Sequence, residues 1–480
     1  MAGIASPEPG RPAPNGRSSE PHPTRAAPLG APAEASWRDV LTGSQGRLTG
    51  GLMLVTLTVA TEALIVTAIM PAIVRDIGGL SLYGLAFSAF FLAGLSSIPT
   101  AGWAVDRYGP ARPFAMLIVV FLAGSVVAAL APSMPVLIVG RVLQGYGATA
   151  QFTLTQSTIA RAYAGRARVS VLSMMSATWT IPALIGPSLG ALIAGAFGWR
   201  WAFAVIIAPA LAAGALTYPR LRRLPPTAAS TAPFPVRWPL QVAAGTGVIL
   251  TGLTAGTWWG IVLVAAGLPV TYFALRRTLP RGSFLARPGL PAIVAAGFLL
   301  NIAFYGAASF VPLLLTRIRG TSITEAGIAV TAGTVAWTAG VWLNTQLVNR
   351  YRRDRLVAAS AALLAVGIGG FATTMYGAPL PAAYVAWLLA GAGMGIAFNV
   401  FTLNTMALAA SGGEGAALAS RNLSANLGTA VGTGVGGAAI ALSESLRLGL
   451  RPGLAFVYAA AAFCAVGAAM LAGRSTVRGG

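Results

Sequence analysis

The sequence predicts an all-α integral membrane protein, and its composition and the length of its apolar segments support that prediction. Apolar residues make up 56% of the 480 residues and charged residues only 9%, whereas soluble domains carry roughly 25% charged residues. The apolar runs are about 20 residues long, which matches one helix across a bilayer core of roughly 30 Å. Because a spanning segment must satisfy its own backbone hydrogen bonds, we expect helices.

The apolar segments predict fourteen transmembrane helices in three groups. Residues 1–47 are rich in Pro, Ala, Gly and Ser without an apolar core, so we expect a disordered N-terminal tail. Six spans follow in a first half (48–218), at roughly 49–74, 82–105, 113–132, 136–160, 169–194 and 199–218. The connecting region 219–288 holds a hairpin at about 238–275, with spans at 238–255 and 257–275. Six more form a second half (289–473), at 289–316, 324–349, 355–377, 382–406, 417–443 and 452–473, before a tail at 474–480.

The distribution of arginine predicts the orientation. With the N-terminus inside, the inner loops and tails hold 24 arginines and the outer loops 6. Cytoplasmic loops carry the excess of basic residues, so we expect both termini in the cytoplasm. A two-helix hairpin preserves this parity, so the arginine distribution does not distinguish fourteen spans from twelve.

An internal repeat indicates two related halves. The segment 105–112 (VDRYGPAR) recurs as 348–355 (VNRYRRDR), which is 243 residues further along, and at that offset Gly84 matches Gly327. Eight predicted spans separate the two copies, where a plain duplication needs six. We therefore predict two pseudo-symmetric six-helix halves with two helices inserted between them.

The residue types that are missing exclude several functions. The chain has no Lys, so a Walker A phosphate loop and Schiff-base chemistry are excluded. It has one His (His22) and one Cys (Cys464), which leave no metal cluster, Cys-His pair or disulfide. Basic residues sit in short segments between apolar runs rather than on one domain, so we expect no nucleic acid partner. We predict no catalytic site, metal or cofactor.

A loop motif follows the second predicted span. The sequence GWAVDRYGPAR at 102–112 resembles the signature loop of the major facilitator superfamily, G-x-L-A-D-R-x-G-R-R. The resemblance implies a cytoplasmic gate, in which Asp106 holds an Arg or a helix N-terminus and latches the outward-open state. Pro110 and Ala111 depart from the pattern. The matching residues are Gly102, Asp106, Arg107, Gly109 and Arg112.

Two further motifs lie on the fourth and fifth predicted spans. RVLQGYGA at 141–148 resembles the family's R-x-x-Q-G-x-G-A, and the resemblance implies that Arg141 takes part in proton transfer. PALIGPSLGA at 182–191 resembles G-x-x-x-G-P-x-x-G-G, which marks exporters in this family. Gly186 and Gly190 would let a neighbouring helix approach, and Pro187 would permit a bend.

The first span contains the acidic residue of greatest interest. TEALIVTAIMP at 61–71 resembles L-D-x-T-I-V-N-V-A-L-P of the fourteen-helix drug:proton antiporters, and Glu62 stands nine residues before the Pro, as the acid does there. Glu62 is the acidic residue that lies deep in a long apolar run. Such a carboxyl group can bind and release a proton as its hydration alternates. A neutral, hydrogen-bonded structural Glu is the alternative.

Other polar or amphipathic residues within apolar runs are candidates for a substrate cavity. Most residues of this kind make contacts between helices or lie at the membrane interface. The candidates are Gln151, Gln156, Asn301, Tyr305, Trp337, Asn344 and Asn399.

Together the motifs imply a major facilitator fold and a proton-coupled efflux transporter, an antiporter that exports small lipophilic or drug-like compounds across the cytoplasmic membrane by alternating access. We expect a small-molecule substrate, protons and the lipid bilayer as partners, and function as a monomer. A narrow exporter of an endogenous metabolite and a solute:proton symporter remain alternatives within transport. A membrane-embedded enzyme is disfavoured by the scarcity of His and Cys and the lack of Lys. A non-transporting sensor is disfavoured because it would need an appended soluble domain, which we do not expect here.

Overall fold

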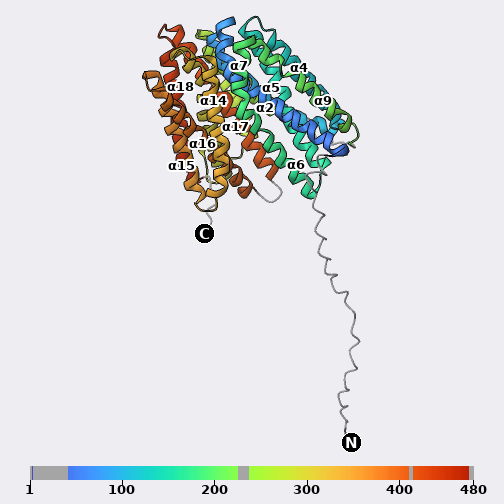
Figure 1. Cartoon of the computed structure of the whole chain (residues 1–480). Helices are drawn as coiled ribbons and strands as arrows, with labels where there is room; N and C mark the ends of the chain where they lie inside the picture. The colour runs from blue at the N-terminus through green and yellow to red at the C-terminus, as the bar shows by residue number, and fades with distance from the viewer. Residues whose placement is uncertain (1–2, 4–41, 225–236, 410–413, 475–480) are drawn as a thin grey trace.

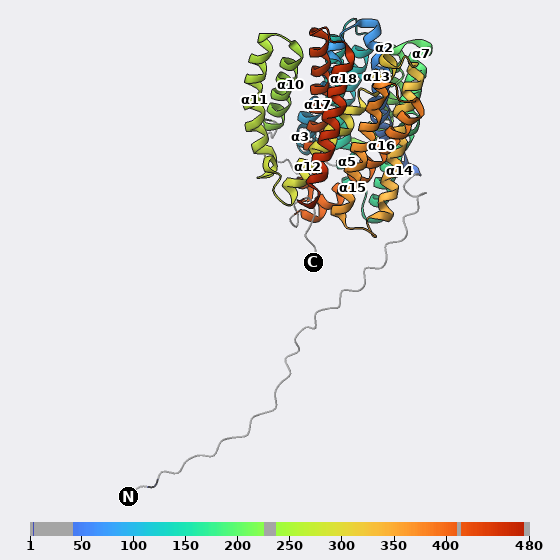
Figure 2. The same ribbon diagram turned by 90° about the vertical axis from the view of Figure 1, so that its left-hand side faces the viewer.

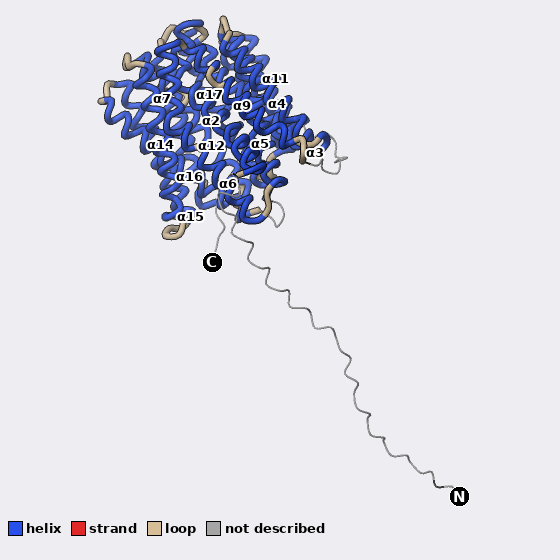
Figure 3. Tube along the Cα trace, turned by 45° about the vertical axis from the view of Figure 1, so that its right-hand side comes forward, coloured by secondary structure: helices blue, strands red, loops and turns tan. Residues whose placement is uncertain are grey.

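The computed structural model describes residues 3, 42–224, 237–409 and 414–474, and the regular structure in these ranges is helical throughout (Figure 3). Most of the predicted N-terminal tail and residues 475–480 lie outside them. The first helix begins at Gly43, earlier than the predicted boundary at 48, because the polar residues 43–47 continue the helix that the apolar run starts.

The helices follow the predicted order, with breaks inside some predicted spans. The first group is α2 (Gly43–Ile77), α3 (Tyr83–Tyr108), α4 (Ala111–Ala129), α5 (Met134–Ala162), α6 (Gly165–Thr178), α7 (Thr180–Phe197), α8 (Trp199–Ala204) and α9 (Ile207–Leu221). The hairpin is α10 (Arg237–Ala255) and α11 (Trp258–Thr278). The last group is α12 (Leu290–Ala308), α13 (Val311–Ile318), α14 (Ile323–Leu347), α15 (Arg353–Ala372), α16 (Leu380–Leu408), α17 (Glu414–Ser445) and α18 (Leu450–Met470). Short 3₁₀ turns lie at Leu80–Leu82, Ser283–Leu285, Thr373–Tyr376 and Ala472–Arg474.

Twelve segments of the described chain are long and apolar enough to cross a membrane. The twelve do not include α5 and α10, which are helices of 29 and 19 residues. α5 is more polar because it carries buried residues such as Arg141 and Gln144. The count of fourteen spans therefore stays a prediction, whereas the all-α membrane fold is confirmed.

The helices of the second group pack in the same pairs as those of the first. α3 and α4 both pack on α5, and likewise α14 and α15 both pack on α16. α2 packs on α7 and α9, as α12 packs on α17 and α18. Contacts between the groups are also matched, since α7 packs on α14 and α3 packs on α17. The fold is thus two pseudo-symmetric halves, as the sequence repeat predicts (Figure 1).

The two ends of the bundle differ. We call the end that holds the first turn of α2 and the last turn of α18 the terminal face, and the opposite end the far face (Figure 2). At the terminal face the backbone N–H of Gly289, just before α12, donates to the carbonyl of Arg474 at 2.8 Å. Since α12 begins at this face, the preceding helix α11 ends there. α10, the other helix of the hairpin, begins at the same face.

The halves are joined toward the far face. If Gly84 carried a Cβ atom, that atom would lie only 2.6 Å from Cα of Gly437, so α3 and α17 approach closely there. Hydrogen bonds between the halves include Tyr83 Oη to Ser309 O (3.0 Å), Ser88 Oγ to Ala430 O (2.8 Å), Ser88 with Thr433 (3.0 Å), Ser188 with Thr331 (2.8 Å) and Thr334 to Ala183 O. These contacts close the seam between the halves on the far face.

The hairpin of α10 and α11 stands at the edge of the bundle (Figure 2). α10 packs on α11 and also on α3 and α17, so it contacts both halves along their seam. Glycines bring the two hairpin helices together, since an added Cβ at Gly260 would lie 2.3 Å from the carbonyl oxygen of Gly252. Most of α11 faces away from the protein.

Candidate functional site

A buried ion pair joins α2 to α5. Glu62 lies near the middle of α2, roughly 23 Å from its end at Ile77 at 1.5 Å per residue. The Nη1 atom of Arg141 on α5 donates to Oε1 of Glu62. The two side chains are 0% and 2% exposed, so the structure brings together the two residues predicted for proton coupling and removes both from solvent.

Neutral partners surround the guanidinium. Arg141 Nη1 also donates to Oε1 of Gln144 at 3.0 Å, and Gln144 Nε2 donates to Oγ of Ser125 on α4 at 3.2 Å. The guanidinium carbon lies 4.4 Å from the ring centroid of Phe90 on α3. Within the described residues, Oε2 of Glu62 and Nε of Arg141 have no hydrogen-bond partner. One carboxylate oxygen is therefore available for a proton.

The glycines of the predicted export motif pack beside this pair. An added Cβ at Gly186 on α7 would lie 3.3 Å from Cβ of Leu64, and one at Gly190 would lie 2.8 Å from Cγ2 of Ile65 and 3.1 Å from its Cα. Side chains at Gly186 and Gly190 would push α7 away from α2 directly after Glu62. The motif thus sets the distance between α7 and the helix that carries the carboxylate.

Pro187 lies between these glycines and faces the other half. An added Cβ at Gly327 on α14 would lie 3.0 Å from the carbonyl oxygen of Pro187 and 2.7 Å from Cβ of Ala191. α7 therefore contacts α2 on one side and α14 on the other. A shift of α7 would change both the surroundings of Glu62 and the seam.

The loop motif lies at the terminal face, and its acid pairs within its own half. Asp106 Oδ1 accepts from Nη2 of Arg161, in the last turn of α5, at 3.0 Å. Both side chains are partly exposed, at 49% and 24%. The pair fastens α3 to α5 rather than linking the two halves.

The other loop residues shape the end of α3. The guanidinium carbon of Arg107 lies 5.6 Å from the ring centroid of Trp103. Gly109 ends the helix with a φ of 72°, a conformation that favours glycine. Gly102 has no neighbour within 4 Å of an added Cβ, and Arg112 is exposed in the first turn of α4.

A row of aromatic rings crosses the seam from the ion pair. Phe90 and Phe91 on α3 have ring centroids 5.4 Å apart, and Phe91 lies 6.2 Å from Tyr305 on α12. Tyr305 lies 5.9 Å from Trp337 on α14, and Trp337 lies 5.7 Å from Phe398 on α16. Two predicted cavity residues, Tyr305 and Trp337, are thus neighbours in one row.

A second buried arginine stands at the other end of this row. The guanidinium carbon of Arg421 on α17 lies 4.5 Å from the ring centroid of Phe398, and its Nη2 donates to the Phe398 carbonyl at 3.3 Å. Its Nη1 donates to Oδ1 of Asn422 at 3.3 Å. Arg421 is 7% exposed, and the partners seen among the described residues are neutral. The sequence signal was an Arg within an apolar run, the same signal that marked Arg141.

Two other predicted cavity residues make contacts inside one half. Gln151 Nε2 donates to the carbonyl of Leu117 at 3.2 Å, which joins α5 to α4. Asn301 Nδ2 donates to the carbonyl of Gly297, one turn earlier in its own helix, at 2.8 Å. Both amides are buried, and these hydrogen bonds within one half explain why a polar side chain is found at each position.

The remaining predicted cavity residues differ in burial. Gln156 is exposed on α5 and Asn399 is half-buried on α16. Asn344 on α14 is fully buried, and neither polar atom of its side chain has a hydrogen-bond partner in the described chain. Buried polar groups are normally hydrogen-bonded, so Asn344 is available to a water or a ligand.

Comparisons with known proteins agree with this architecture. A family model described as Major Facilitator Superfamily matches residues 52–433. The chain is similar to a protein named multidrug resistance protein B homolog from Mycobacterium tuberculosis, with 25% identity over 409 residues, covering 80% of this chain and 74% of the relative. A probable multidrug-efflux transporter from the same species is 29% identical over 423 residues, covering 80% and 85%. A multidrug transporter protein from Bacillus subtilis is 24% identical over 367 residues, covering 74% and 67%.

Solved structures share the fold at low identity. A D-xylose-proton symporter matches with a TM-score of 0.63 and 16% identity, over 91% of this chain and 98% of that one. A bacterial homolog of the human lysosomal transporter Spinster, in an inward-facing and unoccupied conformation, matches with a TM-score of 0.63 and 16% identity, over 91% and 96%. At this identity the likeness concerns the fold alone.

Proposed function

Because the chain belongs to the major facilitator superfamily and is a transporter rather than an enzyme, we propose that it exports small lipophilic or drug-like compounds in exchange for protons. The buried pair of Glu62 and Arg141 carries the proposal. An ion pair at this depth is expensive to maintain, and ionisable groups within spans are usually functional. The names of the relatives support export as the direction.

The pair can couple proton uptake to a change of conformation. A proton bound at Oε2 of Glu62 neutralises the carboxylate and weakens its attraction to Arg141. α2 and α5 are then held less tightly, and α7, which packs on α2 and α14, can move with them. In this scheme a proton enters from the outside, and substrate binding from the cytoplasm displaces it.

The aromatic row provides the surface for a lipophilic substrate. Its rings come from α3 in one half and from α12, α14 and α16 in the other, so a flat apolar molecule could contact both halves at once. Such a surface imposes little directional hydrogen bonding, which suits varied compounds. A narrow exporter of an endogenous metabolite or a solute:proton symporter would use the same fold with a different cavity.

The arginine distribution supports a cytoplasmic membrane location with the terminal face inside. In this orientation the closed seam faces outward, as expected for a state that opens toward the cytoplasm. Each half contributes to the aromatic row within one chain, which supports function as a monomer.

Substrate-induced proton release in everted membrane vesicles, energised to an acid interior, tests the proposal. A panel of lipophilic cations and antibiotics should elicit release with the wild type and not with Glu62→Gln. Glu444→Gln, a change at an exposed glutamate of α17, is the matched control and should retain the response. Unimpaired gradient-driven export by Glu62→Gln would refute the role of Glu62. If the wild-type protein is present in the membrane but no compound elicits proton release, a narrow metabolite exporter or a solute:proton symporter would be favoured.

A further inference from the structure

The hairpin end at the terminal face is strongly basic. Its arginines lie in the first turn of α10, the last turn of α11 and the loop that follows: Arg237, Arg276, Arg277, Arg281 and Arg287. The whole segment 237–287 contains no Asp or Glu. The ion pairs formed among the described residues involve other arginines. Five positive charges therefore gather here, and within the described ranges none of them pairs with a carboxylate.

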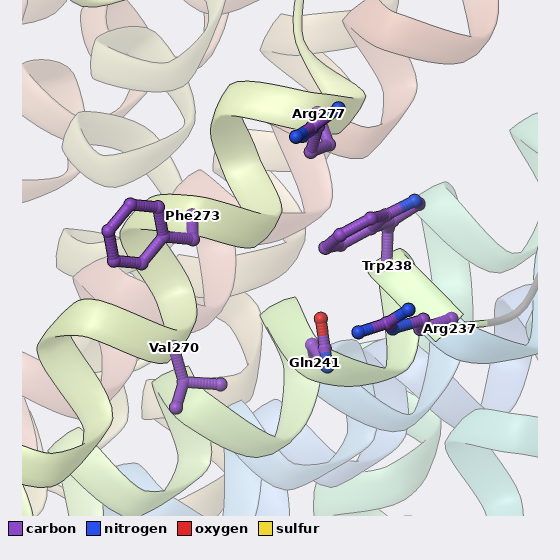
Figure 4. A pocket seen from close by; sticks show the side chains of 6 residues that line it. All are labelled: Arg237, Trp238, Gln241, Val270, Phe273 and Arg277. Carbon is purple, nitrogen blue, oxygen red and sulfur yellow. The ribbon is translucent and has the colours of Figure 1, made fainter.

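These arginines line two neighbouring cavities. The first, of about 340 Å³, lies between the start of α10 and the end of α11 and is lined by Arg237, Trp238, Gln241, Val270, Phe273 and Arg277 (Figure 4). The second, of about 590 Å³, includes Arg276, Arg281, Arg287 and Phe284. Arg277 and Phe273 line both. The two cavities form one basic site with aromatic walls.

Aromatic rings orient the guanidinium groups. The guanidinium carbons of Arg237 and Arg277 lie 4.9 Å and 5.7 Å from the ring centroid of Trp238, and that of Arg276 lies 5.6 Å from Tyr272. An arginine packed on a ring keeps its N–H groups free for an anion. A planar fork of this kind matches phosphate oxygens bidentately.

The site lies at the level of lipid headgroups. α11 has 21 residues and is thus roughly 31 Å long, about the thickness of the bilayer core. At its other end Trp258 and Trp259, both exposed and with rings stacked at 3.7 Å, mark the opposite interface. Arg276 and Arg277 therefore lie in the interface of the leaflet at the terminal face.

We propose that these two cavities bind the phosphate headgroup of an anionic phospholipid. The arginines supply charge-assisted hydrogen bonds to the phosphate, as in basic pockets between transmembrane helices. Val270 and Phe273 are 42% and 61% exposed on the membrane side of Arg277, where the first part of an acyl chain would lie. This apolar edge favours a lipid over free phosphate.

Native mass spectrometry of the full chain, delipidated in detergent, tests the proposal. The protein is titrated with phosphatidylglycerol, with phosphatidylcholine and with inorganic phosphate. We expect phosphatidylglycerol to bind most tightly. Arg276→Gln/Arg277→Gln should weaken it roughly 30-fold, equivalent to about 2 kcal/mol at about 1 kcal/mol per arginine.

The control removes the same charge from the same end of the bundle. Arg350→Gln/Arg355→Gln changes two exposed arginines, one in the connection after α14 and one in the first turn of α15, away from the cavities, and should leave phosphatidylglycerol binding unchanged. Equal loss in both variants would reveal a general charge effect and overturn the site. Displacement of phosphatidylglycerol by millimolar inorganic phosphate would overturn the lipid assignment in favour of a free anion. Equal binding of phosphatidylcholine would overturn selectivity for an anionic lipid.

Discussion

The ion pair of Glu62 and Arg141 makes an asymmetric prediction for stability. Glu62→Leu leaves a guanidinium that is 2% exposed and cannot lose its proton, whereas Arg141→Met leaves a carboxyl group that can neutralise itself by binding one. Breaking a buried pair from one side costs about 3–5 kcal/mol. We expect Glu62→Leu to fall in that range and Arg141→Met to cost less.

The double replacement should recover stability. Glu62→Leu/Arg141→Met puts apolar side chains of similar volume into the same space, and such a change to a buried pair is often neutral or stabilising. The two single variants and the double variant form a double-mutant cycle. Its coupling energy should therefore exceed about 2 kcal/mol, whereas the stability changes of independent sites add to within roughly 0.5 kcal/mol. Transport should be absent from all three variants.

The free energy of unfolding, measured by titration with a denaturing detergent, gives the four corners of the cycle. Glu444→Gln is measured in the same way and gives the change in the free energy of unfolding for an exposed glutamate. Additive single changes would mean that the pair is not formed in the native state. Retained proton-coupled transport by the stable double variant would separate the pair from coupling and refute the mechanism.

Three other changes test separate parts of the molecule. Gly437→Leu places a side chain where even Cβ would lie 2.5 Å from Cα of Gly84, and overpacking of about 1–3 kcal/mol should open the far face, seen as faster labelling of cysteines introduced there. Asp106→Asn breaks a partly exposed pair with Arg161, so the free energy of unfolding should change by less than about 1 kcal/mol, and a large change would show a tighter contact. Arg421→Gln removes a buried charge whose described partners are neutral, so stability should hold or rise while transport falls; a loss of stability with intact transport would contradict a functional role.

The sequence was informative about helices and about isolated charges. Apolar runs located the helices to within a few residues, because membrane crossing requires a continuous apolar length. Glu62 and Arg141 were each conspicuous as ionisable residues in apolar surroundings. Their contact was not predicted, since it joins residues 79 positions apart and depends on how α5 packs on α2.

The aromatic row was only partly predictable. Tyr305 and Trp337 were candidates because their polar atoms stood out in apolar runs, whereas Phe91 and Phe398 carried no such mark. Phe398 borders Arg421, while Phe463 is 78% exposed on the outside of α18, yet both are phenylalanines in apolar segments. Only the packing of the helices distinguishes a ring in the row from one that faces lipid.

The two halves share their packing but differ in chemistry at matched positions. At the repeat offset of 243 residues, Gly84 corresponds to Gly327, and each meets the opposite half through a close contact. At the same offset Glu62 corresponds to Tyr305, a ring of the aromatic row. An acid in one half thus stands where the other half places an aromatic surface. In the proposed mechanism one rocking motion would move both positions, so a proton bound in the first half and a substrate held partly by the second would influence each other without touching.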